Sequence, residues 1–421
     1  MGQATVTIRE VCAVEGTAFE VKRGRYIYIG PRGVIEEIGE KPIPADIVID
    51  GRGLIAIPAF VNAHAHIEDA IAKDAGLGLP FEQLVLPPDG LKHRILRSAP
   101  DDELIRGMRE ALMYMAYAGI AAVADYRTSG LRGVELGEKA FSNLDVRVIT
   151  FGRFTRNVPF TEEELRENRA KLPKDVRAEI VEILKRADGF CLSSVNDVTD
   201  PALEEIYEVT EAMGKLRSVH AAESEGYVRV SLSRTGKSDV ERAVECLKPH
   251  FLVHMTHACP SDIKLVAEKG IPVVCCPRAN GLLGNGFPPL REMLEAGVLI
   301  ALGTDNVFLN SPDMFREMEY VFKAAKAFYK DTTFLDPKMV LRMATINGAR
   351  ALGLDEELGT IEEGKKGSLV LLDMRSLNLW PMRDPISSIV NRATVADIRY
   401  VILEGRIVRS PEGLAYPSPS A

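Results

Sequence analysis

Cysteine and basic charge are both in short supply in this chain. Its six cysteines are scattered through 421 residues and form no C-x-x-C pair, which argues against a disulfide framework and a cysteine-based zinc module. We therefore expect buried, reduced thiols in a cytoplasmic protein. The formal net charge of -8 also argues against a nucleic-acid partner, which would require a basic face.

Long apolar runs are missing as well. No stretch approaches the roughly 18 uninterrupted apolar residues that a membrane helix needs, and the N-terminus shows no basic region followed by an apolar core. The sequence therefore predicts neither a membrane span nor a signal peptide. At 46% hydrophobic and 27% charged residues, it is typical of a globular protein with a large core.

What the chain does contain is an alternation of strand-like apolar runs and helix-like segments between about residues 58 and 355. Such alternation predicts a parallel sheet, and the span is in the range of an eight-stranded barrel. We therefore predict an α/β protein with a (β/α)8 TIM-type barrel over residues 58–355 and a small β-sandwich domain formed jointly by residues 1–57 and 356–421. The eight expected barrel strands lie near residues 57–64, 119–125, 146–152, 188–193, 216–220, 251–254, 271–275 and 298–303.

The few histidines are concentrated. Five of the seven fall in two tight groups, and the tighter group, His64-Ala65-His66, closes the apolar run 55–62. We expect that run to be one buried strand. Residues two apart on a strand point to the same side. Both imidazoles would therefore aim at one spot at the carboxyl end of the strand, where they could bind a divalent metal ion.

Other metal-ligating residue types follow later strands. His220, His254 and Asp305 each come just after a short apolar run. Because the active site of a β/α barrel lies at the carboxyl ends of its strands, we expect these side chains to meet the first two histidines. A ligand set of three of these histidines with the aspartate would suit Zn²⁺ or Fe²⁺ with room left for water. Glu223 could reach a metal-bound water, although its spacing fits a solvated loop acid equally well.

Seven short motifs are spread over the chain. They are PAFVNAHAH at 58–66, VHAAES at 219–224, VH at 253–254, CPRAN at 276–280, GTDN at 303–306, NSPDMFREM at 310–318 and ATINGA at 344–349. Together they resemble the amidohydrolase superfamily over essentially the whole chain. Within it, the chain is most similar to the branch of cytosine deaminase, the triazine hydrolases and S-adenosylhomocysteine/methylthioadenosine deaminase.

The resemblance implies a role for each matching residue. Glu223 matches the proton shuttle, and His254 matches the histidine beside the metal-bound water and the substrate. His257 follows three residues later and is the alternative for that position, although we favour His254 because it directly ends the apolar run. The residues that match the metal ligands are His64, His66, His220 and Asp305.

One metal ion per chain is expected. The binuclear members of the superfamily carry a carboxylated lysine at the end of strand 4, and the corresponding segment here, residues 188–194, contains no lysine. Zn²⁺ is the first choice and Fe²⁺ the second. His93 and His250 match no motif of the family, and we expect both to be structural or exposed.

The resemblance also implies the chemistry. Hydroxide on the metal would attack a carbon that bears an exocyclic amine, Asp305 would take the proton of the water, and Glu223 would protonate the adjacent ring nitrogen so that ammonia leaves. We therefore predict a mononuclear metal-dependent hydrolytic deaminase of a purine, pyrimidine or adenosine-like heterocycle. The alternatives are hydrolysis of a cyclic amide or imidazolone C–N bond and, less favoured, a non-catalytic binding protein.

The substrate is less well defined. The segment after His66 departs from the more apolar, proline-containing stretch usual in adenosine-type deaminases. Arginines near strand ends could hold a carboxylate or phosphate in a forked pair, or form surface salt bridges; Arg153 and Arg278 are favoured. A small-molecule substrate is the expected partner, and homo-oligomers are possible by resemblance. The candidate substrate-binding residues are Glu68, Asp69, Tyr126, Arg127, Arg153, Arg156, His257, Arg278 and Asn280.

Overall fold

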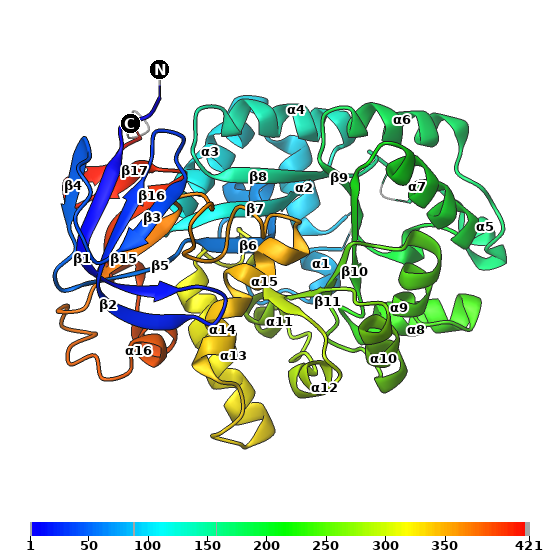
Figure 1. The fold of residues 1–421 in the computed structure, drawn as a ribbon. Helices are drawn as coiled ribbons and strands as arrows, with labels where there is room; N and C mark the ends of the chain where they lie inside the picture. The colour runs from blue at the N-terminus through cyan, green and yellow to red at the C-terminus, as the bar shows by residue number, and fades with distance from the viewer. Residues whose placement is uncertain (1, 87–88, 157, 417–421) are drawn as a thin grey trace.

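Two sheets organise the chain (Figure 1). The structure is a computed structural model, and it describes residues 2–86, 89–156 and 158–416. The larger sheet has the strand order β13-β12-β11-β10-β9-β8-β7-β6-β14, and all its pairings are parallel. Its strands are β6 (Phe60–His66), β7 (Ile120–Tyr126), β8 (Arg147–Gly152), β9 (Gly189–Leu192), β10 (Leu216–Ala221), β11 (Phe251–His254), β12 (Val273–Cys275), β13 (Ile300–Leu302) and β14 (Asp305–Asn306).

This sheet is the barrel expected from the alternation in the sequence. Each of the eight expected strands is present, and β13 and β14 together occupy the eighth position because only Gly303 and Thr304 separate them. β14 pairs with β6, so the last strand position meets the first. Strands such as β7 are buried along their whole length, as parallel strands covered on both faces must be.

Helices cover the outside of the barrel and begin with recognisable signals (Figure 1). The expected capping box of Thr161 and Glu164 is present at α5, and acidic residues open α3, where the helix dipole favours them. The barrel helices are α1 (Phe81–Leu84), α2 (Leu91–Ser98), α3 (Asp101–Tyr117), α4 (Gly130–Phe141), α5 (Glu162–Glu167), α6 (Lys174–Leu184), α7 (Asp200–Ala212), α8 (Glu225–Thr235), α9 (Asp239–Arg242), α10 (Pro260–Glu268), α11 (Pro277–Leu282), α12 (Leu290–Glu295), α13 (Met314–Tyr329), α14 (Pro337–Met343) and α15 (Ile346–Ala351), with the short turns η1 (Ile67–Ala72), η2 (Val195–Asp197) and η3 (Ala243–Leu247).

The two ends of the chain build the smaller sheet jointly. β5 from the N-terminal part pairs antiparallel with β15 from the C-terminal part, and a separate apolar core lies against this sheet. The sheet has nine strands in the order β18-β17-β16-β15-β5-β1-β2-β3, with β4 also paired to β1. These strands are β1 (Val6–Glu15), β2 (Glu20–Ile29), β3 (Ile35–Gly39), β4 (Ile47–Asp50), β5 (Leu54–Pro58), β15 (Leu369–Asp373), β16 (Ile398–Leu403), β17 (Arg406–Ser410) and β18 (Gly413–Leu414).

The apolar run 55–62 is not one strand, contrary to our expectation. Its first part is β5 in the small sheet and its second part is β6 in the barrel. The chain changes partners at Ala59: the Ala59 N–H donates to Ser368, whereas the Phe60 N–H donates to Gly119. Periodicity could not reveal this switch, because both halves are equally apolar and equally buried.

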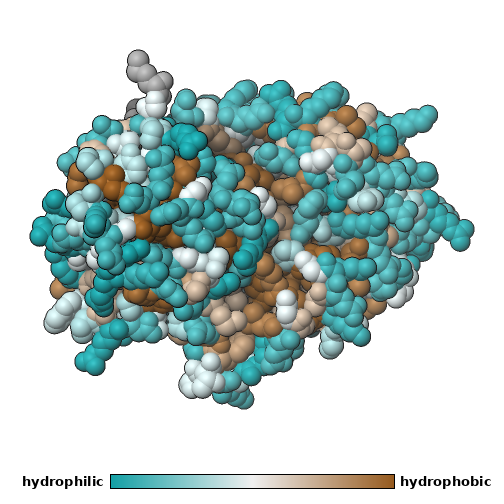
Figure 2. All heavy atoms as spheres, viewed as in Figure 1, coloured by the Kyte–Doolittle hydropathy of each residue, from teal (hydrophilic) through white to brown (hydrophobic). Residues whose placement is uncertain are grey.

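The C-terminal segment also contains helical structure that we did not expect. α16 (Pro385–Arg392) packs against α13 and α14 of the barrel and is followed by the turn η4 (Val395–Asp397). The domain division at residues 57/58 and 355/356 therefore stays a prediction, with α16 as a contact across it. Figure 2 shows a largely hydrophilic surface on the drawn face, with hydrophobic residues visible in hollows near its middle. Among the described residues, every helix is too short or too polar to cross a bilayer.

The closure of the barrel gives a first prediction. A Cβ atom added to Gly303 would lie 2.8 Å from the Cβ atom and 2.9 Å from the carbonyl oxygen of His64, so Gly303→Ala should push β14 away from β6. We expect the free energy of unfolding to fall by about 1–3 kcal/mol. The matched control is Gly226→Ala in α8, where the added Cβ meets only the Ser224 hydroxyl at 3.6 Å. Equal urea denaturation curves for both variants would contradict this account.

Candidate metal centre

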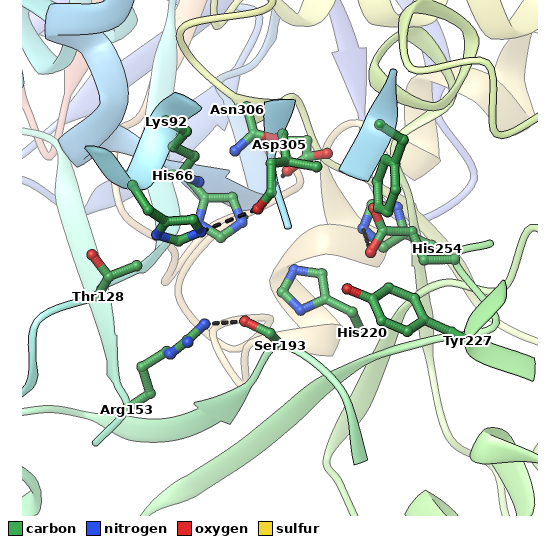
Figure 3. Close-up of a pocket in the computed structure, with 14 residues that line it drawn as sticks. His66, Lys92, Thr128, Arg153, Ser193, His220, Tyr227, His254, Asp305 and Asn306 are labelled. Carbon is green, nitrogen blue, oxygen red and sulfur yellow. Dashed lines mark hydrogen bonds and ion pairs between the residues drawn. The ribbon is translucent and has the colours of Figure 1, made fainter. Parts of the chain in front are cut away.

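Four histidines and one aspartate, His64, His66, His220, His254 and Asp305, meet at the carboxyl ends of the barrel strands, and Figure 3 shows all of them except His64. The Asp305 Oδ1 atom lies 3.3 Å from His64 Nε2 and 3.5 Å from His66 Nε2. The His220 ring centroid is 5.0 Å from that of His64 and 5.2 Å from that of His254. Two overlapping sets, His64 with His220 and His254, and His64 with His66 and Asp305, each have their ligand atoms within 4.8 Å of one another.

The hydrogen bonds of the rings leave the correct atoms for a metal ion. His66 Nδ1 lies 3.2 Å from the Tyr126 carbonyl oxygen and His220 Nδ1 lies 3.1 Å from the Leu192 carbonyl oxygen. Each ring therefore donates from Nδ1 and keeps the Nε2 lone pair for the centre of the cluster. The buried ring nitrogens of His64 make no hydrogen bond to the described residues. Buried polar atoms normally have partners, so these orphaned nitrogens fit a bound cation.

Burial keeps the imidazoles neutral. It lowers the pKa of His64, His220 and His254 to about 3 each, and it lowers the pKa of His66 well below its usual value. A metal ligand must be an unprotonated imidazole. The cluster therefore presents metal-binding nitrogens across the physiological pH range without losing a proton first.

Backbone strain gathers at the same place. His254, Met255 and Asp305 adopt positive φ angles of 77°, 55° and 59°, and Ala222, just before Glu223, adopts 46°. Non-glycine residues in this region cost about 1–3 kcal/mol each and persist only where the surroundings impose them. The strain marks the cluster as the place where the fold holds side chains in set directions.

Glu223 is buried rather than a solvated loop acid. Its Oε2 atom lies 3.9 Å from His254 Nε2. Burial first, and then the charge of Asp305, raise the pKa of the Glu223 carboxyl to about 8. This carboxyl can therefore hold a proton at neutral pH beside the histidine cluster.

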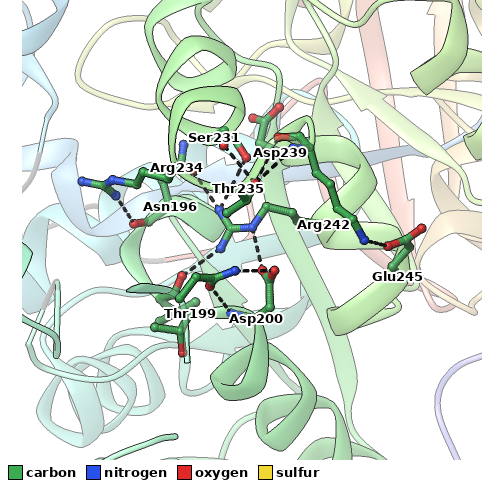
Figure 4. Close-up of polar contacts among 12 residues, drawn as sticks. Asn196, Thr199, Asp200, Ser231, Arg234, Thr235, Asp239, Arg242 and Glu245 are labelled. Atoms are coloured by element: carbon green, nitrogen blue, oxygen red, sulfur yellow. Dashed lines mark hydrogen bonds and ion pairs between the residues drawn. The ribbon is translucent and has the colours of Figure 1, made fainter. Parts of the chain in front are cut away.

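A buried polar network holds the Glu223 loop from behind (Figure 4). The Asp239 carboxylate accepts a hydrogen bond from the Ala222 N–H at 2.8 Å. One helical turn on, the buried Arg242 guanidinium donates to Asp200 at 2.6 Å and to the Asn196 side chain at 3.0 Å. The Asn196 amide in turn donates to the backbone carbonyl of Tyr227 at 2.9 Å, and Tyr227 lines the pocket.

A pocket opens onto the cluster, and Figure 3 shows its polar side chains pointing inward. Arg153, at the end of β8, hydrogen-bonds to Ser193 across this pocket. Of the candidate substrate-binding residues, Arg153 alone is among the pocket-lining residues. These are His66, Phe81, Val85, Lys92, His93, Thr128, Arg153, Ser193, His220, Glu223, Tyr227, His254, Asp305 and Asn306.

Three candidates lie behind the pocket-lining residues rather than among them. Glu68 accepts hydrogen bonds from the backbone and side chain of Thr128, and Arg127 lies 3.3 Å from Glu68 and is fully enclosed. The Tyr126 ring lies 4.2 Å from the His64 ring in the barrel interior. A fourth, Asp69, is buried against Lys92. Substrate contact by these four residues has no support in this geometry.

The remaining candidates lie away from the pocket walls. Arg156 forms an exposed ion pair with Asp175, and Arg278 pairs with the buried Glu317 in a separate cavity. His257 Nε2 lies 2.6 Å from the Asn285 carbonyl oxygen. Asn280 is buried and donates to the Thr256 hydroxyl at 2.8 Å.

Sequence reasoning missed several residues that line the pocket. His93 was expected to be structural or exposed, but it is buried there with Nε2 3.1 Å from the Val85 carbonyl oxygen. Lys92, beside it in α2, is also buried. Neither follows a strand, so the strand-end rule could not find them; a buried lysine in a helix has no spacing signal of its own.

Metal-dependent stability tests the composition of the cluster. Zn²⁺ at a thousand times its Kd should raise the free energy of unfolding by about 4 kcal/mol. We expect His220→Gln to lose most of the resulting rise in Tm, because it removes a nitrogen that faces the centre. His257→Gln is the matched control and should keep the rise. If His257→Gln lost the Zn²⁺ effect and His220→Gln kept it, His257 and not His220 would be the metal ligand.

The pH dependence of stability tests the support of the Glu223 loop. Burial raises the pKa of the Asp239 carboxyl to about 6. Between about pH 4 and 6 the folded chain therefore holds this proton more tightly than the unfolded chain, so its contribution to stability falls as the pH rises. In Asp239→Asn this contribution is absent, while the amide oxygen can still accept from Ala222. Urea unfolding at pH 4, 5, 6 and 7 should show a smaller decline than wild type; parallel profiles would contradict the assignment.

Comparisons with known proteins agree with this geometry. The model of the Amidohydrolase family matches residues 55–408. A protein of Methanothermobacter thermautotrophicus named "Putative aminohydrolase" is 41% identical over 377 residues, which cover 90% of this chain and 92% of that protein. The 5-methylthioadenosine/S-adenosylhomocysteine deaminase of Moorella thermoacetica is 29% identical over 399 residues, which cover 91% of this chain and 87% of that enzyme.

The fold has solved counterparts too. The crystal structure of an adenosine deaminase from Xanthomonas campestris with bound zinc superposes with a TM-score of 0.84 at 22% identity, covering 98% of this chain and 94% of that one. This likeness confirms the predicted barrel with its smaller sheet. The family model spans most of the chain, and the matched range contains the histidines and Asp305 that could hold a metal ion. The chain therefore belongs to the amidohydrolase family and is a metal-dependent hydrolase that acts on a small molecule.

Proposed function

We propose that the protein is a mononuclear metal-dependent deaminase of an aminated purine, pyrimidine or adenosine-like heterocycle. The observation that carries the proposal is the buried carboxyl of Glu223, whose Oε2 atom lies 3.9 Å from His254 Nε2 in the histidine cluster. Burial raises the pKa of this carboxyl to about 8. A group that donates a proton to a ring nitrogen at neutral pH needs such a pKa. Named deaminases among the relatives, such as the enzyme of Moorella thermoacetica, favour the same reaction.

The residues that would hold the metal ion are His64, His66, His220 and Asp305. When bound, the ion supplies an activated water as the nucleophile. Zinc is favoured because the similar adenosine deaminase of Xanthomonas campestris carries it; iron remains the second choice. A single ion is favoured because both possible ligand sets share His64 and β9 contains no lysine.

Each proton movement has a candidate residue. Asp305 would accept a proton as the water adds to the carbon that bears the amine. Glu223 would deliver its proton to the adjacent ring nitrogen, so that negative charge does not accumulate there. Asp305 would then pass its proton to the exocyclic amine, and the hydroxyl proton of the adduct would return to Glu223. The C–N bond breaks as the carbonyl forms, ammonia leaves, and both carboxyl groups are restored. His254, 3.9 Å from Glu223, would orient the reacting groups.

The test is ammonia release from protein reconstituted with Zn²⁺ or, separately, Fe²⁺. The panel holds aminopurines, aminopyrimidines, adenosine derivatives, pterins and small formimino compounds. We expect turnover of one class, and Glu223→Gln should lower kcat by about 10²–10⁴-fold while metal content stays the same. Glu225→Gln, an exposed glutamate two residues on, is the matched control and should keep its activity.

The outcomes separate the alternatives. Ammonia from one class that is lost in Glu223→Gln supports deamination and names the substrate family. Ring opening of a cyclic amide or imidazolone without ammonia would replace deamination by hydrolysis of a ring C–N bond. A protein that binds one metal ion and turns over neither class would contradict the proposed reaction for the compounds tested.

A further inference from the structure

A buried ion pair lies beside the metal cluster and has no part in the proposed chemistry. Asp69 in η1 is fully buried, and its carboxylate lies 3.1 Å from the Lys92 ammonium of α2. The same carboxylate accepts hydrogen bonds from the Asn306 side chain at 2.8 Å and from the Phe308 N–H at 3.0 Å. Lys92 and Asn306 appear together at one side of the pocket in Figure 3.

The hydrogen bonds that Asp69 accepts hold the segment that carries Asp305. Asn306 and Phe308 are the first and third residues after Asp305, which itself sits at a φ of 59°. β14 has two residues, and among the strands that the structure describes it pairs only with β6. Such a short strand has few ladder bonds to resist rotation, so the Asp69 carboxylate supplies much of the restraint on the far side of Asp305.

Lys92 connects one wall of the pocket, through Asp69, to the segment that follows Asp305. It lies in α2, which together with α1 forms one wall of the pocket. This wall packs on the residues after Asp305 through a small apolar cluster of its own, whose buried members are Ala72, Leu84, Phe308 and Leu309. The Asp69–Lys92 ion pair therefore lies where the α1–α2 wall and the pocket meet β14, the strand that carries Asp305.

We propose that Asp69 is a positioning residue that sets the direction of the Asp305 carboxylate, and that Lys92 is the counter-charge that holds Asp69 in place and ties the pocket wall to it. The proposal rests on the metal-binding role of Asp305. Removal of either partner leaves the other charge buried and unpaired, which is strongly unfavourable. Both single changes should therefore disturb the same short strand.

Metal affinity separates positioning from simple electrostatics. A purely electrostatic role predicts opposite effects: Asp69→Asn removes a negative charge near the cation and weakens binding, whereas Lys92→Met removes a positive charge and tightens it. Positioning predicts that both variants weaken binding. It further predicts that Asp69→Asn with Lys92→Met loses less affinity than the two single losses together, because the double variant leaves no buried charge unpaired.

The experiment measures Zn²⁺ affinity by competition with a chromophoric chelator, and the visible absorption spectrum of the Co²⁺ protein. We expect Asp69→Asn to lose about 10–100-fold in Zn²⁺ affinity, as is typical when a partner of a metal ligand is removed, and to change the Co²⁺ band shape. Tighter binding in Lys92→Met together with wild-type affinity in the double variant would overturn the proposal. An unchanged Co²⁺ spectrum in Asp69→Asn would overturn it as well.

A matched control distinguishes positioning from general loss of stability. Glu15 in the small sheet is also buried and pairs with Arg25 at 2.7 Å. Glu15→Gln should lower Tm but leave Zn²⁺ affinity and the Co²⁺ spectrum unchanged. If Asp69→Asn fails to fold, Lys92→Met still decides by the sign of its effect. No substrate is needed, so wild-type protein that binds metal but releases no ammonia would contradict the proposed reaction and leave this inference to be decided by the variants.

Discussion

The closure of the barrel is the constraint on which the site depends. Asn62 of β6 and Thr304, just before β14, exchange two buried hydrogen bonds of 2.7 and 3.0 Å. Gly303 passes so close to the His64 backbone that no side chain fits between them. These contacts bring the last strand position against the first. Without them Asp305 would not reach the histidine pair of β6, with which it forms one of the two sets that could hold a metal ion.

Closure also creates the electrostatic problem that the site must solve. Asp305 and Glu223 are both buried, and burial first, then the charge of Asp305, raise the pKa of Glu223 to about 8. Two ionised carboxylates in one dry pocket repel each other. The neutral imidazoles around them offer no positive charge, because burial holds the pKa of three of them at about 3. The proposed cation beside Asp305 and a proton on Glu223 would relieve this repulsion together.

The ends of the strands could be predicted from the sequence, but the directions of the polar side chains that follow the strands could not. The histidines and Asp305 could be predicted to converge because the barrel fixes where a residue at a strand end must lie. Arg127 has the same placement, yet its guanidinium turns back to Gly133 and Asp125 under the pocket. Lys92 reaches the pocket from a helix, and that position depends on how the wall packs. The local sequence pattern predicts the path of the backbone, whereas long-range packing decides where a flexible polar side chain points.

The two carboxylates proposed to move protons share a structural principle. Each is flanked by backbone that a second buried carboxylate holds: Asp239 accepts the Ala222 N–H just before Glu223, and Asp69 accepts the Phe308 N–H just after Asp305. A carboxylate can fix a strained loop because it accepts several N–H donors without requiring a proton of its own. Two such supports, one beside each proposed proton-transfer residue, would let the loops keep their strained φ angles.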